Sequence, residues 1–176
     1  MPSKTNKILA AAAFAAGGVV FWKLLTTPGR AASTSPVEVS IEVEASVSAA
    51  YQQWARFEEY PKFMAGVHEV HQLDDTHVQW RAEVGGQEKQ WNAEIVEQIP
   101  YMRIAWRSIS GVPHEGVVTF QKVSETRTNV VLKTHSDAFF LDEQISDTAS
   151  AGRLWANGTL NNFKQLLERT EQRSVF

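Results

Sequence analysis

Six runs of alternating apolar and polar residues follow one another through the middle of the chain, and they constrain its fold more than any other feature. Alternation puts every second side chain on the same face of a β-strand. Turn residues such as Gly85-Gly86 separate the runs, which is typical of hairpins between antiparallel strands. The sequence therefore predicts an antiparallel sheet. Its strands are expected at Val67–Leu73, His77–Val84, Gln87–Ile99, Met102–Ser108, Gly116–Val123 and Asn129–Ser136.

Elements before and after these runs complete the predicted domain. Val37–Glu44 alternates branched apolar residues with polar ones, which predicts a seventh strand with one face in water. Ser46 can then cap a short helix, and Pro61 marks a second one. Asp142–Glu171 has helical spacing, so the order is one strand, two short helices, six strands and a long helix. The apolar stripe of the long helix is predicted at Leu154, Trp155, Leu160, Phe163, Leu166 and Leu167.

The Gly85-Gly86 pair predicts the register of its hairpin. If these glycines are the two central residues of a tight turn, Trp80 lies directly opposite Trp91. Directly opposed side chains share one face of a sheet. The reverse face of both strands then carries only polar residues, so the two tryptophans are expected to face inward.

The same counting extends the inner face across the next two hairpins. A turn at residues 100–101 puts Ile95 opposite Trp106, so this third indole joins the first two. A turn over Gly111–Pro113 then pairs Trp106 with Val118. One wide apolar face results, and it needs a cover.

This apolar face has two interpretations, a packed core or the lining of a ligand cavity. Large aromatic side chains bury about 150 to 250 Å² each, so packing against the long helix explains them without any ligand. A curled sheet that grips one helix can instead leave a gap, and apolar gaps with a few polar groups bind small molecules. On the second interpretation the cavity-lining residues are Trp80, Trp91, Ile95, Trp106, Phe120, Leu132, Trp155 and His68.

His68 is the best candidate for a titratable group on the inner face, because it shares the strand parity of Val70. A histidine in such a place can equally be a hydrogen-bonded core residue. His114 and Glu115 are expected in a loop, either at the mouth of the cavity or simply in water. His68 and His71 are three residues apart on a strand and face opposite ways, so no metal site is predicted.

Composition narrows the possible partners. The chain has 176 residues, which suits one domain with attachments. A formal net charge of -3 and the lack of a basic cluster make nucleic acid a poor partner. The sequence contains no cysteine, which excludes disulfides, thiolate metal sites and cysteine nucleophiles. No dinucleotide-binding, phosphate-binding or metalloprotease motif is present, so no cofactor is expected.

The N-terminal residues differ in kind from the domain that follows at 37–172. Residues 8–22 carry no charge, and the apolar run continues past Lys23, so residues 8–25 would span roughly 27 Å as a helix. Residues 1–25 are therefore predicted to be a single-pass membrane anchor. The alternatives are a cleaved signal peptide of a secreted or periplasmic protein, and a buried or peripheral helix. Residues 26–36 are small, polar and turn-forming, which predicts a flexible linker.

Three stretches of the chain, 42–70, 91–108 and 116–123, resemble the START-like helix-grip superfamily. The resemblance is to its polyketide cyclase/dehydrase-like branch, which includes coenzyme Q-binding proteins, and it covers about Val37 to Glu168. It implies an α+β fold in which a seven-stranded antiparallel sheet wraps around a long C-terminal helix. Members of this superfamily bind lipids, quinones, hormones or polyketides, and some are cyclases or dehydratases. The resemblance is specific for the fold and implies no shared catalytic set.

Two functions are compatible with the sequence. The first is a noncatalytic protein that binds a lipid, quinone or polyketide-like molecule and is tethered to a membrane by residues 8–25. The second is a cyclase or dehydratase, which would need an acid or base inside the cavity. The predicted inner face is poor in carboxylates, so the sequence favours the binding protein.

Overall fold

The computed structural model describes residues 36–136 and 148–174. Within these ranges the predicted order of elements is confirmed, from one strand through two short helices and six strands to a long helix. The elements are β1 (Val37–Val43), α2 (Val47–Trp54), the 3-10 helix η1 (Phe57–Lys62), β2 (Val67–Gln72), β3 (His77–Val84), β4 (Gln87–Ile99), β5 (Arg103–Ser108), β6 (His114–Lys122), β7 (Thr128–Ser136) and α3 (Thr148–Ser174).

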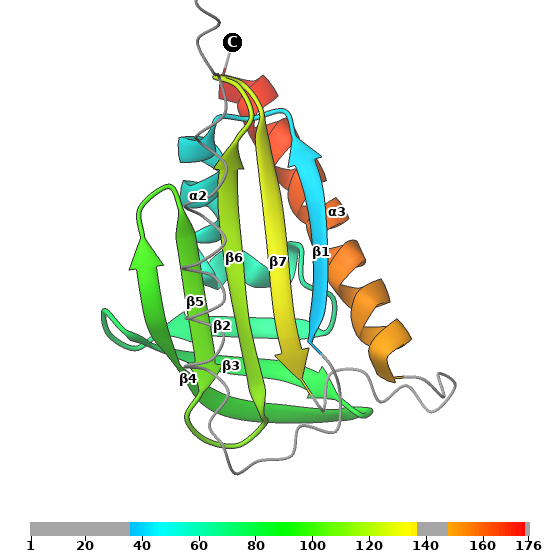
Figure 1. Cartoon of the computed structure of the whole chain (residues 1–176). Coiled ribbons are helices and arrows are strands. Elements are labelled where there is room, and N and C mark those ends of the chain that lie inside the picture. The colour runs from blue at the N-terminus through cyan, green and yellow to red at the C-terminus, as the bar shows by residue number, and fades with distance from the viewer. Residues whose placement is uncertain (1–35, 137–147, 175–176) are drawn as a thin grey trace, which may run out of the picture. The chain divides into compact units, whose positions relative to one another are not determined.

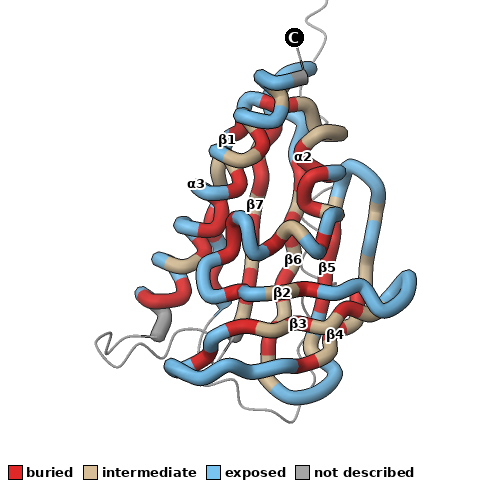
Figure 2. The backbone as a smooth tube through the Cα atoms, turned by 180° about the vertical axis from the view of Figure 1, so that it is seen from behind, coloured by how far each residue is buried: buried red, intermediate tan, exposed pale blue. Residues whose placement is uncertain are grey.

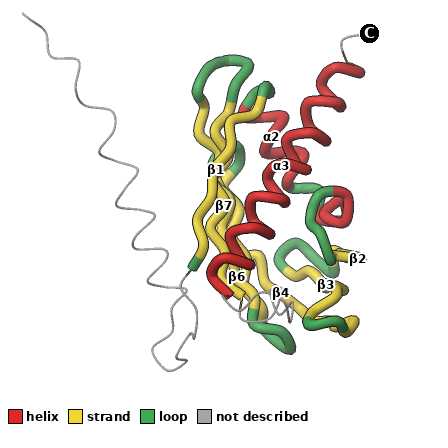
Figure 3. Tube along the Cα trace, turned by 90° about the vertical axis from the view of Figure 1, so that its right-hand side faces the viewer, coloured by secondary structure: helices red, strands yellow, loops and turns green. Residues whose placement is uncertain are grey.

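The seven strands form one antiparallel sheet in the order β1-β7-β6-β5-β4-β3-β2. The sheet is strongly curved. Figure 1 shows that β2 and β3, at one end of the sheet, run across the direction of β6 and β7. Helix α3 packs against β1 and β7, and α2 lies on the same side of these strands (Figure 3). This arrangement confirms the predicted α+β helix-grip fold.

The hairpin registers follow the prediction in part. Trp80 lies opposite Trp91, and both turn glycines between them have positive φ, as a tight hairpin turn requires. Ile95 lies opposite Trp106 as predicted, although a bulge shifts the pairs nearer the turn by one residue. The pairing of Trp106 with Val118 was wrong, because β6 begins at His114 and Trp106 faces Gly116. A shift of two residues keeps the same side chains on the inner face.

The long helix buries a stripe that differs in one member from the prediction. Leu160, Phe163 and Leu167 are buried, and Figure 2 shows buried and exposed positions alternating along α3. Leu154 was predicted in this stripe, but it is 67% exposed. Each helical residue advances by about 100°, so Leu154 points nearly opposite to Ala156, which is buried.

Ser46 caps α2 as predicted, and its Oγ accepts a hydrogen bond from the Ala49 N–H at 3.2 Å. Replacing Ser46 by alanine is expected to lower the free energy of unfolding by about 1 kcal/mol, because this N–H loses its acceptor. Urea unfolding followed by circular dichroism measures the change. The matched variant Ser48→Ala, whose hydroxyl contacts only the exposed Gln52 side chain, should stay within about 0.5 kcal/mol of the parent. Equal losses in both variants would contradict a capping role.

The predicted anchor (residues 1–25) and all but the last residue of the predicted linker (26–36) lie outside the described residues. Among the residues that the structure describes, no helix combines the length and hydrophobicity needed to cross a membrane.

Candidate functional site

Three tryptophans and a histidine meet on the inner face of the sheet, on β3, β4, β5 and β6. Trp80 and Trp91 stack with their ring centroids 5.8 Å apart and their planes 10° from parallel. The His114 ring stands perpendicular to both, at centroid distances of 5.2 Å from Trp80 and 6.1 Å from Trp91. Its centroid lies 5.9 Å from that of Trp106. We call these four buried residues the Trp-His cluster.

Two glycines leave the space that the indole rings occupy. A Cβ atom on Gly116 would lie 2.4 Å from Cζ2 of Trp106, the residue opposite it on β5. A Cβ atom on Gly111 would lie 2.9 Å from Cβ of Trp91, and Gly111 also has a φ of 69°. Larger residues at these positions would displace the rings. The positions of the rings of Trp106 and Trp91 therefore depend on glycine in β6 and in the loop that precedes it.

His114 was predicted to lie in a loop, but it is the first residue of β6 and is buried among the indoles. Ser108 Oγ accepts a hydrogen bond from the His114 backbone N–H at 3.0 Å, which extends the β5–β6 hairpin by two residues beyond the prediction. Burial, with a smaller repulsion from His135, lowers the pKa of the His114 imidazole to about 3. The imidazole is therefore neutral near pH 7. In this form one ring nitrogen can donate a hydrogen bond and the other can accept one.

The indole N–H groups of Trp80 and Trp106 are buried and have no hydrogen-bond acceptor among residues 36–136 and 148–174. Buried donors normally find a partner, and an unmade hydrogen bond of this kind costs about 1 to 3 kcal/mol. Tyr60 lies next to them, with its ring centroid 5.4 Å from that of Trp80. Burial raises the pKa of its hydroxyl well above the usual value, so this group also remains a donor. The indole N–H groups of Trp80 and Trp106 are thus donors that a ligand acceptor could satisfy.

The inner face offers very little charge to a ligand. In the described part of the chain the buried polar side chains are Gln53, His114, Thr128, Thr134 and Thr159, with no lysine, arginine or carboxylate among them. Thr128 and Thr134 donate to the backbone carbonyls of Ala45 and Glu115. His114 is therefore the buried titratable group nearest to the indoles.

His68, the residue predicted to be the inward titratable group, points outward. A bulge between Val67 and Glu69 adds one residue to β2, so Val67 and Val70 both face inward and His68 lies between them on the outer side. Its Nδ1 is 3.2 Å from Oε2 of Glu88. The prediction was wrong because strand parity was counted through the bulge.

The other predicted residues are placed in three ways. Ile95 and Leu132 are buried on the inner face. Phe120 is buried farther along the same face and contacts α2, with its ring centroid 6.3 Å from that of Trp54. Trp155 on α3 is half-buried, and its indole Nε1 donates to the Ala65 carbonyl at 2.9 Å. Ile95, Leu132 and Phe120 therefore share the inner face of the sheet. Trp155 instead links α3 by its hydrogen bond to the segment that follows η1.

Replacing Trp155 by phenylalanine keeps a ring and removes the donor to Ala65. We expect the free energy of unfolding to fall by about 1 kcal/mol, the net value of one such hydrogen bond. Urea unfolding measures it. Leu154→Ala, one residue away on the exposed side of α3, is the control and should change stability by less than about 0.5 kcal/mol. No loss in Trp155→Phe would show that the hydrogen bond contributes nothing.

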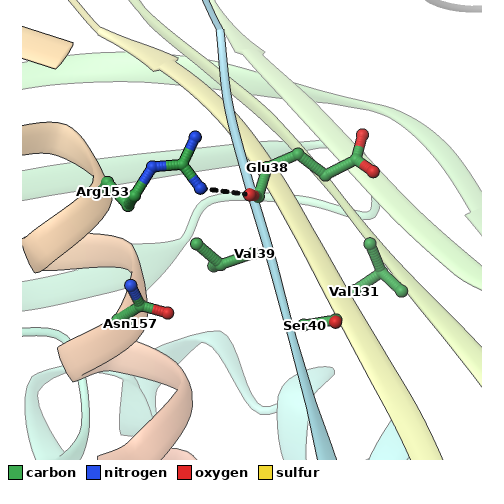
Figure 4. Close-up of a pocket in the computed structure, with 6 residues that line it drawn as sticks. All are labelled: Glu38, Val39, Ser40, Val131, Arg153 and Asn157. Carbon is green, nitrogen blue, oxygen red and sulfur yellow. Dashed lines mark hydrogen bonds between the residues drawn. The ribbon is translucent and has the colours of Figure 1, made fainter. Parts of the chain in front are cut away.

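A crevice with a volume of about 380 Å³ lies at the opposite end of the sheet, between β1 and α3 (Figure 4). None of the eight predicted cavity-lining residues borders it. The cavity-lining role of the Trp-His cluster therefore stays a prediction. The lining residues of the crevice are Glu38, Val39, Ser40, Val131, Arg153 and Asn157.

The fold recurs in solved structures of low sequence identity. The Zhui aromatase/cyclase from Streptomyces sp. R1128 matches with a TM-score of 0.63 and 17% identity, over 77% of this chain and 94% of that one. A START superfamily protein from Mycobacterium smegmatis matches with a TM-score of 0.60 and 16% identity, over 78% and 97% of the two chains. At such identities the likeness shows the shared fold alone.

Sequence comparisons show the family. An uncharacterized 17.2 kDa protein of Streptomyces lincolnensis is 38% identical over 139 residues, which cover 78% of this chain and 93% of that protein. The family model described as polyketide cyclase / dehydrase and lipid transport matches residues 43–146. This range includes β2 to β7 and all four residues of the Trp-His cluster. The chain belongs to the polyketide cyclase / dehydrase and lipid transport family.

Proposed function

We propose that this protein binds an uncharged hydrophobic small molecule that carries hydrogen-bond acceptors. The observation that carries the proposal is the pair of buried indole N–H groups, on Trp80 and Trp106, for which the described part of the chain supplies no acceptor. A ligand carbonyl or ether oxygen beside them would supply it. The family description, which joins polyketide cyclases with lipid transport, supports a ligand of this kind.

The lack of charge around the cluster selects against ionised ligands. A carboxylate moved into this site would lose its hydration and meet no buried cation in the described residues. His114 would not replace such a cation, because its low pKa keeps it neutral near pH 7. Neutral ketones, quinones or esters suit the site better than fatty acids do.

A cyclase or dehydratase is the second candidate, and the position of His114 against the three indoles favours it. A reaction of this class needs an acid or base in contact with the substrate. The Tyr60 hydroxyl has a pKa well above its usual value and is a weak acid, and the His114 imidazole, with a pKa of about 3, is a weak base. Binding without chemistry therefore agrees better with these two side chains.

Access to the cluster requires side chains to move. Trp80 and Trp106 are each 1% exposed, and Trp80 stacks directly on Trp91. A ligand that reaches the indole N–H groups must separate or rotate these rings. Binding should therefore change the tryptophan fluorescence of the protein.

Mass spectrometry of bound compounds tests the proposed function. The full chain is purified without added lipid and extracted with organic solvent, and the extract is analysed against one from a mock purification. We expect an uncharged apolar compound in the parent and much less in the double variant Trp80→Phe/Trp106→Phe, which keeps both rings but lacks both donors. Trp155→Phe removes a donor that already has an acceptor and should retain the compound. Equal amounts in all three proteins, or none in any, would overturn the proposal.

We further propose that residues 8–25 tether the protein to the membrane in which such a ligand dissolves. The support is the uncharged run from Ile8 to Trp22 in the sequence. Alkaline carbonate extraction should leave the full chain in the membrane pellet and release a variant that lacks residues 8–25. A shortened chain in the soluble fraction would instead indicate a cleaved signal peptide.

A further inference from the structure

Strand β1 lies at one edge of the sheet, so half of its backbone groups face away from β7. The Glu38 carbonyl accepts from Arg153 Nη1 at 3.3 Å, and the Glu42 carbonyl accepts from Lys164 Nζ at 2.7 Å. Both donors are side chains of α3. Every second residue of a strand turns its backbone N–H and C=O to the same side, so Ser40 presents both groups to this edge.

The Ser40 backbone lies between the two capped carbonyls and borders the crevice between β1 and α3 (Figure 4). No side chain of the described residues makes a hydrogen bond to its N–H or C=O. The crevice volume of about 380 Å³ falls within the range of small-ligand sites, about 300 to 1,000 Å³. There is space here for two residues of an extended chain to pair with the edge.

Arg153 gives the crevice a positive end. One of its guanidinium nitrogens donates to the Glu38 carbonyl, and no carboxylate of the described residues pairs with the remaining N–H groups. The Glu38 carboxylate points away from Arg153 in Figure 4 and lies 3.4 Å from Lys133 Nζ. A guanidinium binds a carboxylate through two parallel hydrogen bonds when its donors are available.

Asn157 and two valines complete the walls. Asn157 lies one helical turn after Arg153 on the same side of α3, and its amide can both donate and accept. Val39 lies on the side of Asn157, and Val131 borders the crevice from the other side of β1 (Figure 4). The crevice therefore offers a peptide-like hydrogen-bond pair, an amide, a small apolar surface and a cation.

We propose that this crevice binds the carboxyl-terminal end of an extended peptide. The penultimate residue pairs with the Ser40 N–H and C=O, as an added antiparallel strand does. In that orientation the chain runs toward Glu38, so the terminal carboxylate arrives at Arg153. Short free peptides and protein tails share this chemistry. The site is independent of the Trp-His cluster, since no residue is common to both.

Fluorescence anisotropy with a labelled peptide tests the site. The probe is fluorescein-Gly-Gly-Ala-Ala with a free carboxylate, titrated with the full chain, and its partner probe ends in a carboxamide. We expect saturable binding of the first probe and binding at least about tenfold weaker for the second, because the carboxamide carries no charge for Arg153. Equal binding of the two probes, or no binding of the first at millimolar protein, would overturn the proposal.

Variants locate the site. Arg153→Gln and Asn157→Ala should weaken binding of the first probe, Arg153→Gln by at least about tenfold. Arg169→Gln and Asn161→Ala are matched changes on exposed positions of α3 outside the crevice and should bind as the parent does. Ser40→Pro removes the edge N–H and should abolish binding, with circular dichroism to check that it folds. Unchanged binding in both Arg153→Gln and Asn157→Ala would contradict the assignment.

Competition distinguishes the two sources of the ligand. N-acetyl-Ala-Ala and an unstructured ten-residue peptide ending in Ala-Ala each displace the labelled probe. Equal inhibition constants indicate that the site reads a short free peptide, and at least about tenfold tighter inhibition by the longer peptide indicates a protein tail. Failure of both to displace the probe would contradict the proposed site.

Discussion

Replacing Gly116 by valine is expected to lower the free energy of unfolding by at least about 3 kcal/mol, and the loss should appear as a large shift in a urea unfolding curve. The reason is steric, because a Cβ atom at this position would lie 2.4 Å from Cζ2 of Trp106. Trp106 is 1% exposed and is packed against its neighbours, so moving its ring aside costs free energy. Overpacking of a core costs about 1 to 3 kcal/mol for ordinary insertions, and this contact is unusually short.

Two further variants show whether the Trp106 ring causes the loss. Gly158 lies on α3 and a Cβ atom there meets nothing within 4 Å, so Gly158→Ala should raise stability by up to about 1 kcal/mol. The double variant Gly116→Val/Trp106→Leu should recover part of the loss relative to the sum of the single changes. A Gly116→Val protein as stable as the parent would show that the ring is not confined.

Acidification is expected to destabilise the protein through His114, by roughly 4 to 5 kcal/mol between pH 7 and pH 3. The imidazole takes up a proton near pH 6.5 in the unfolded chain and at about pH 3 in the folded one. Between these values the unfolded state binds the extra proton, so this contribution is complete above about pH 6.5 and is lost as the pH falls. At pH 5 the loss is already roughly 2 kcal/mol.

A variant without the imidazole isolates this effect. His114→Phe keeps a ring in the cluster and His114→Gln keeps a polar group, and neither titrates. As the pH is lowered from 7 to 4, the free energy of unfolding of the parent should fall by more than that of either variant. Urea unfolding at several pH values measures this. A difference between parent and variant that stays constant over this range would mean that His114 is not buried in its neutral form.

The fold could be predicted because its strands alternate and its turns are marked. The Gly85-Gly86 pair sits between two runs of clear parity, so the opposition of Trp80 and Trp91 followed from counting alone. The loop between β5 and β6 contains several possible turn residues, and the hydrogen bonds of Ser108 determine where β6 begins. The alternation of apolar and polar residues contains no information about these hydrogen bonds. The predicted partner of Trp106, Val118, was therefore two residues away from the actual partner, Gly116.

The site could be predicted less well, because its titratable residue depends on distant packing. His114 has no local signal for burial, and the rings that enclose it come from three other strands. For His68 a signal was present, since Val67 and Val70 are three residues apart and can share a face only across a bulge. The aromatic face was thus predictable, and the group that gives it polarity was not.

If the Trp-His cluster binds uncharged molecules that bear acceptors, calorimetric titration of the full chain should distinguish between two compounds of similar size. The compounds are 1,4-naphthoquinone, which is neutral and carries two carbonyls, and 2-naphthoate, which is ionised at pH 7. We expect the quinone to bind, at least about tenfold more weakly to Trp80→Phe/Trp106→Phe than to the parent, and we expect the carboxylate to bind the parent much more weakly than the quinone does. Equal affinity for the two compounds, or quinone binding unchanged in the double variant, would contradict this expectation.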